Sequence, residues 1–110
     1  MKMRKEKEIP KKFKDILDEL GVEYSGIILF GSRAKDMSER ESDWDFLVIL
    51  KKSMNIESKK KLWLKIHKKF HEYFPFTSVD IILKDADSFK EEKTIANTIS
   101  NEVYLEGISI

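Results

Sequence analysis

The sequence predicts a single α/β (α+β) domain in which a small mixed sheet has helices packed on one side. Short apolar runs of strand length occur at residues 27–30, 46–50 and 79–83, and stretches with helical spacing of apolar residues lie before, between and after them. The chain has 110 residues, of which 41% are hydrophobic and 37% are charged. This composition suits one compact core, so we expect one domain over residues 1–110.

The first helix is expected between Pro10 and Gly21, since proline suits a first helical turn and glycine a helix end. A strand at 26–30, a short helix at 33–37 and a strand at 45–50 follow. Residues 58–73 are predicted as an amphipathic helix whose buried stripe comprises Leu62, Ile66, Phe70 and Tyr73. The third strand is expected at 79–83. A last helix is predicted from Ser88 to Glu106, with a capping box at its start and Ile95, Ile99 and Val103 buried.

Charge and composition exclude several classes of protein. The 21 basic and 20 acidic residues nearly cancel, which gives no general attraction to nucleic acid, and the absence of cysteine excludes disulfides and thiolate metal sites. No apolar stretch approaches the roughly 20 residues that a membrane span needs, and the lysine-rich start does not have the form of a secretory signal. A cytoplasmic location without membrane attachment is therefore expected.

The most informative motif is Gly31-Ser32, followed after ten residues by Asp43-Trp44-Asp45. Alternate residues of a strand point to the same face, so the two aspartates are expected about 6.5 to 7 Å apart at Cα and able to share one cation or bracket two. A Gly-Ser step permits close approach of the backbone to a phosphate, and a helix start near Ser32 would present N–H groups to an anion. The arrangement predicts a site for metal-bound phosphate.

A third carboxylate, Asp80, is the one polar residue in the apolar run at 79–83. Acidic side chains in or beside such runs are costly to bury unless they are paired or bind a metal. Taken alone, a Gly-Ser step is more often an ordinary turn, and an Asp-x-Asp pair is more often a solvated strand end. The combination with Asp80 favours a functional site.

These residues resemble the minimal nucleotidyltransferases of the DNA polymerase β superfamily, whose signature is Gly-Ser, ten residues, Asp-x-Asp and a later aspartate. The chain departs from the family where Lys35-Asp36 replaces the common Arg-Gly, which affects the far end of the loop and not the aspartates. The matching residues are Gly31, Ser32, Arg33, Ala34, Ser42, Asp43, Asp45, Leu47, Val48 and Asp80.

The resemblance implies a polymerase β-like core and transfer of AMP from ATP to an acceptor hydroxyl with Mg²⁺, two ions in the family's usual scheme. Asp43, Asp45 and Asp80 are the expected catalytic and metal-binding residues. Gly31, Ser32 and Arg33 are expected to bind the nucleotide, with Lys35 assisting by its charge.

The acceptor is the less determined part of this prediction. The small size and the resemblance point to the antitoxin of HEPN/MNT toxin–antitoxin pairs, in which the partner HEPN toxin is modified on a tyrosine. A stand-alone transferase acting on a small molecule or an RNA end is one alternative, and an antitoxin that neutralises its partner by binding alone is another. The lysines of the 58–73 helix are expected to form a solvated face, and His67 and His71 lack a third metal ligand nearby in sequence.

Overall fold

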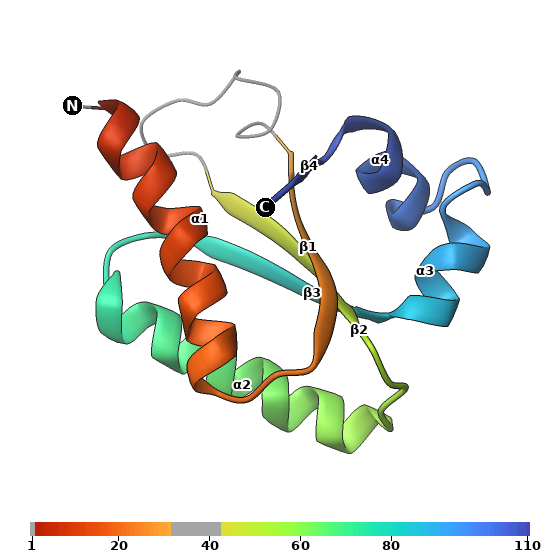
Figure 1. Cartoon of the computed structure of the whole chain (residues 1–110), viewed down its shortest axis with the longest axis horizontal. Helices are drawn as coiled ribbons and strands as arrows, with labels where there is room; N and C mark the ends of the chain where they lie inside the picture. Colours follow the sequence, from red (N-terminus) through yellow and green to blue (C-terminus); the bar gives the residue numbers. More distant parts are fainter. Residues whose placement is uncertain (1, 32–42) are drawn as a thin grey trace.

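A four-stranded mixed sheet forms the centre of the molecule in the computed structural model, which describes residues 2–31 and 43–110 (Figure 1). The strand order is β3-β2-β1-β4; β1 runs antiparallel to β2 and β4, whereas β2 and β3 are parallel. The predicted mixed sheet is thus confirmed. The elements in chain order are α1 (Lys2–Glu19), β1 (Tyr24–Phe30), β2 (Trp44–Leu50), α2 (Ile56–Tyr73), β3 (Val79–Asp85), α3 (Ala86–Glu92), α4 (Ile99–Glu106) and β4 (Ile108–Ser109).

Helices cover both faces of this sheet rather than the one face predicted (Figure 1). Alternate residues of each strand point to opposite faces, and both sets are apolar here. On one face, Phe46 of β2 packs with α1 and α2 in the main core. On the other face, Leu47 packs with Phe89 of α3 and Val103 of α4 in a smaller cluster.

The first helix begins earlier than predicted, at Lys2, so Pro10 lies in its interior and not in its first turn. Proline lacks an N–H and costs roughly 3 kcal/mol in the middle of a helix. Ile9 and Phe13 are fully buried on either side of Pro10, and this burial continues the apolar stripe through the proline. Tertiary packing therefore overrides the local signal for a helix start.

The second long helix, α2, lies where it was predicted and begins two residues earlier, after the N-cap Asn55, whose side chain accepts a hydrogen bond from the Ser58 N–H (2.8 Å). Ile66 and Phe70 are buried as expected, whereas Tyr73 is 41% exposed. The Phe70 ring meets Phe13 edge-on, with ring centroids 6.3 Å apart, and thereby joins α2 to α1.

The single last helix predicted from Ser88 to Glu106 is instead two helices, α3 and α4. The N-cap of α3 is Asp85, which accepts a hydrogen bond from the Ser88 N–H (2.8 Å), so the expected capping box is not the helix start. Asn97 adopts a left-handed conformation (φ 69°) and Thr98 caps α4. This turn leaves Ile95 and Ile99 exposed and buries only Val103 of the three predicted core residues.

Two further points concern the helices and strands that were predicted. The short strand β4 was not predicted, and the predicted short helix at 33–37 lies outside the described residues. In the part of the chain that the structure describes, no helix has the length and apolar character needed to cross a bilayer.

Candidate active site

Three aspartates meet at the end of the sheet where the parallel strands β2 and β3 begin. Asp45 lies directly opposite Asp80 in the register of these strands, and Asp43 precedes β2 by one residue. The structure therefore places the three aspartates that sequence reasoning selected at one end of the sheet.

Gly31 lies against this group because β1 ends at Phe30, which pairs with Asp45. Its backbone has a φ of +76°, a conformation that residues with a Cβ rarely adopt. A Cβ at this position would also overlap the carboxylate of Asp45. Glycine therefore suits this position because of its backbone conformation, and any larger residue would require the Asp45 carboxylate to move.

The electrostatics of the group are dominated by mutual repulsion. Burial, followed by the charges of Asp80, Asp43 and Glu102, raises the pKa of Asp45 to about 6. All the charges that cause this shift are negative, so the described part of the site is acidic. A bound cation would relieve this repulsion, as expected for carboxylates arranged to hold a metal.

The donor chemistry fits a hard cation such as Mg²⁺, which prefers carboxylate oxygens. Within residues 2–31 and 43–110, however, no three acidic or histidine side chains converge closely enough to hold a metal ion by themselves. The charges of the aspartates act on one another, but the three side chains do not form a complete set of metal ligands. This is consistent with Mg²⁺ binding, which usually takes a few carboxylates and completes its shell with water and substrate phosphates.

Most of the predicted nucleotide loop lies outside the described residues. Of the three residues expected to bind nucleotide, only Gly31 is described, and Ser32 and Arg33 lie outside the described residues. The same applies to Lys35 and Asp36, where the chain departs from the family signature.

Sequence reasoning missed Glu102, a fourth carboxylate in this region. Glu102 lies on α4, beside the buried Val103, and its charge acts on Asp45. The prediction of one continuous helix did not indicate that Glu102 would lie near the sheet. No sequence signal distinguished it from the other glutamates of that segment.

A hollow of about 440 Å³ opens along α4, and Glu102 forms part of its wall. The wall combines amide, hydroxyl and carboxylate groups with two aliphatic side chains. Its residues are Asn97, Thr98, Ile99, Asn101, Glu102, Leu105 and Glu106.

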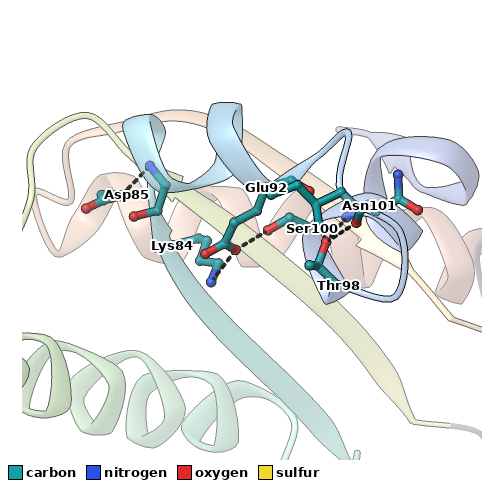
Figure 2. Close-up of polar contacts among 8 residues, drawn as sticks. Lys84, Asp85, Glu92, Thr98, Ser100 and Asn101 are labelled. Atoms are coloured by element: carbon teal, nitrogen blue, oxygen red, sulfur yellow. Dashed lines mark hydrogen bonds and ion pairs between the residues drawn. The ribbon is translucent and has the colours of Figure 1, made fainter.

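A hydrogen-bond network fixes the start of α4 to α3 and β3 (Figure 2). Glu92 pairs with Lys84 of β3 (2.7 Å) and accepts a hydrogen bond from the buried Ser100 (3.1 Å). The Thr98 hydroxyl is within 2.9 Å of the carbonyl oxygen of Glu92, and the Asn101 amide donates to the carbonyl of Lys93 (2.7 Å). These contacts fix the start of α4 relative to α3 and β3.

The other candidate residues have structural roles. The Trp63 Nε1–H donates to the carbonyl of Ile81 (2.8 Å), and a ring nitrogen of His71 is hydrogen-bonded to the carbonyl of Thr77 (3.0 Å). His67 stacks on Trp63, with ring centroids 4.6 Å apart. These contacts account for the pair of histidines on α2 without a metal.

Comparison with known proteins identifies a family and a solved structure of similar fold. Residues 11–105 match the family model described as "Polymerase beta, Nucleotidyltransferase". A solved structure described as "Crystal structure of the toxin-antitoxin with AMP-PNP" is similar in fold, with a TM-score of 0.63 and 17% sequence identity over 90% of this chain and 69% of that chain. The curated proteins contain no match.

Proposed function

This chain belongs to the polymerase β nucleotidyltransferase family, and from that premise we propose that it transfers AMP from ATP to a hydroxyl group on a partner protein. The observation that carries the proposal is the in-register placement of Asp45 opposite Asp80, with Asp43 beside them and Gly31 against Asp45. Carboxylates at one end of a sheet, next to a turn that favours glycine, suit metal-bound triphosphate.

In this proposal each residue has a distinct role. Asp43 and Asp45 would hold the metal ion that carries the triphosphate, and together with Asp80 they would hold a second ion on the acceptor side. When bound, Mg²⁺ neutralises phosphate charge and favours the ionised form of the acceptor hydroxyl. Asp80, exposed at the start of β3, accepts a hydrogen bond from that hydroxyl, orients it and takes its proton as the oxygen attacks phosphorus.

The phosphate end of ATP lies at the turn after β1. Gly31 allows the triphosphate to approach the backbone closely, and Ser32 donates a hydrogen bond to it. Arg33 balances the phosphate charge. This positioning places the α-phosphorus in line with the acceptor oxygen, so that the hydroxyl oxygen bonds to phosphorus as pyrophosphate leaves.

A partner protein is the favoured acceptor for two reasons. The solved structure with a similar fold is a toxin–antitoxin complex that contains AMP-PNP, an ATP analogue. In addition, the described groups around Asp45 are acidic, which suits a protein better than the phosphate backbone of RNA. We therefore place the chain as the antitoxin of a HEPN-type toxin, with a tyrosine hydroxyl of the toxin as acceptor.

The test incubates the protein with Mg²⁺, ATP labelled on the α-phosphate, and the co-expressed partner. Asp43→Asn and Asp45→Asn should each abolish labelling, by at least about a hundredfold, because each removes a charge that holds the metal. Asp87→Asn, an exposed aspartate on α3, is the matched control and should label like the wild type.

The outcome separates the proposal from its alternatives. Label on a small molecule or an RNA end would retain the transferase and replace the protein acceptor. Equal suppression of partner toxicity by wild type and Asp43→Asn, without any labelled product, would instead indicate neutralisation by binding alone.

A further inference from the structure

A second hollow, of about 240 Å³, lies between the first half of α2 and the end of β3, the outermost strand on that side of the sheet. Leu83 stands three residues beyond Asp80 on β3, about 10 Å along the strand, towards the end where α2 begins (Figure 1). The hollow is therefore separate from the acidic site. Its wall, which the structure describes in full, consists of Ile56, Lys59, Lys60, Trp63 and Leu83.

The apolar part of this wall is held firmly against β3. The Trp63 Nε1–H donates to the carbonyl of Ile81 (2.8 Å), and the Trp63 ring stacks on His67. Leu83 is buried beside it, whereas Ile56 is 82% exposed. An aliphatic or aromatic side chain that entered the hollow would therefore remove apolar surface from water on a preformed site.

The rim of the hollow is basic. Between residues 58 and 69, α2 contains six lysines and no acidic residue, and no residue of the wall is acidic. Lys59 acts electrostatically on Asp85 at the end of β3. Lys60 is exposed, and among the described residues it forms no ion pair. Its charge is therefore available to a carboxylate of another molecule.

An apolar hollow with a basic rim favours a protein segment over a nucleic acid. Sequence-tolerant binding of single strands uses exposed aromatic rings on which bases stack, but Trp63 already lies between His67 and β3, and its N–H is bonded. Ile56 and Leu83 offer a base no hydrogen bond. A peptide with one large apolar residue and flanking carboxylates complements both the hollow and the lysines.

We propose that the hollow between α2 and β3 is a docking site for an acidic segment of a partner protein. One aliphatic or aromatic side chain of the segment fills the hollow, and neighbouring carboxylates pair with Lys60 and the other exposed lysines of α2. The inference goes beyond the proposed function and does not depend on it. A partner docked at this end of β3 leaves Asp45 and Asp80 accessible at the other end.

The test measures binding of four fluorescent peptides of equal length by anisotropy. Three carry a central Leu-Phe pair flanked by glutamate, glutamine or lysine, and the fourth carries Ser-Ser between glutamates. The glutamate peptide should bind about fivefold or more tightly than the glutamine peptide, as expected for two or three exposed ion pairs, and the difference should shrink in high salt. Replacement of Leu-Phe by Ser-Ser should cost about tenfold or more.

Variants assign that binding to the hollow. Lys60→Glu should weaken the glutamate peptide about tenfold, whereas Lys68→Glu, the same change at an exposed position of α2 outside the hollow, should weaken it by about twofold or less. Ile56→Ser should weaken it about three- to fivefold. Ile95→Ser, which also removes an exposed isoleucine but far along the chain from the hollow, should leave the affinity unchanged.

The inference is overturned if the glutamate peptide shows no binding at millimolar concentration, or binds no more tightly than the lysine peptide. Equal losses in Lys60→Glu and Lys68→Glu would also overturn it. A single-stranded RNA that binds more tightly than the glutamate peptide would assign the lysines to nucleic acid instead. Self-association of the wild type in sedimentation velocity that Lys60→Glu abolishes would assign the hollow to a second copy of this chain.

Discussion

At the scale of single residues, Gly31 is sensitive to substitution because of both its backbone conformation and its contact with Asp45. Gly31→Ala adds a Cβ that overlaps the Asp45 carboxylate, in a backbone conformation that already disfavours alanine. We expect a loss of about 1 to 3 kcal/mol in the free energy of unfolding, together with loss of AMP transfer. Denaturant unfolding with a transfer assay checks both.

Two other glycines separate the causes of that loss. Gly21 has the same left-handed backbone (φ +69°) in open space, so Gly21→Ala measures the backbone strain alone. Gly26→Ala, where the added Cβ meets only Ile49 at an ordinary 3.5 Å, should be nearly neutral. If Gly31→Ala cost no more than Gly21→Ala, the contact with Asp45 would carry no energetic weight.

At the scale of secondary-structure elements, the start of α3 depends on Asp85. Its carboxylate accepts the Ser88 N–H, and hydrogen bonds from Ser88 hold the pKa of Asp85 below its usual value. Asp85→Ala should lower the free energy of unfolding by about 1 kcal/mol, as is typical for loss of an N-cap. Asp85→Asn keeps a capping oxygen and should cost less.

The pH dependence of this contribution has a definite sign. Because the folded-state pKa of Asp85 is lowered, the charged cap stabilises the fold above the unfolded-state pKa of about 3.9, and the effect disappears as pH falls through the folded value. The stability difference between wild type and Asp85→Asn should therefore vanish in acid. A difference that grows below pH ~4 would contradict this assignment.

Most elements could be predicted from the sequence because their apolar patterns are regular. β1, β2, β3 and α2 all occur within two residues of their predicted bounds. The errors arise where distant contacts outweigh local signals. Pro10 lies inside α1 because Ile9 and Phe13 are buried together.

The C-terminal segment shows the same limit. The turn before α4 depends on Asn97 adopting a left-handed conformation and on Thr98 bonding to Glu92. Neither feature interrupts the apolar spacing that predicted one helix. The two-residue strand β4 has no periodicity to detect, since it is defined only by its pairing with Ile28 and Leu29.

The residues of the candidate site also differ in whether they could be predicted from the sequence. Asp43, Asp45 and Asp80 could be selected because each is an acidic residue in or beside an apolar strand, a contrast that is local in sequence. Glu102 could not be selected, because its relevance arises from the packing of α4 against the sheet. The contact between Gly31 and Asp45 is also visible only once β1 and β2 are paired.

At the scale of the whole molecule, the like charges of the acidic site lower the free energy of unfolding. Burial and like charges raise the pKa of Asp45, so its ionised form destabilises the fold at neutral pH. Without divalent ions at pH 8, Asp45→Asn should be more stable than the wild type by about 1 kcal/mol, allowing for screening by solvent.

Added Mg²⁺ should make the wild type more stable than Asp45→Asn. A ligand that binds only the folded state raises its stability, so millimolar Mg²⁺ should raise the Tm of the wild type by a few degrees and that of Asp45→Asn by less. Differential scanning fluorimetry checks this, with Asp87→Asn as the control that should follow the wild type. An equal response of Asp45→Asn and wild type would argue against a metal at this position.

The parallel pairing of β2 and β3 has a consequence for a chain still being synthesised. Asp43 and Asp45 emerge from the ribosome well before Asp80, and parallel strands cannot pair until the crossover that contains α2 has been made. Glu102 emerges later still. A product of interrupted translation that stops within α2 therefore contains Asp43 and Asp45 but lacks Asp80. Under the proposed function, AMP transfer therefore requires synthesis to have passed β3, and fragments that stop within α2 are expected not to consume ATP.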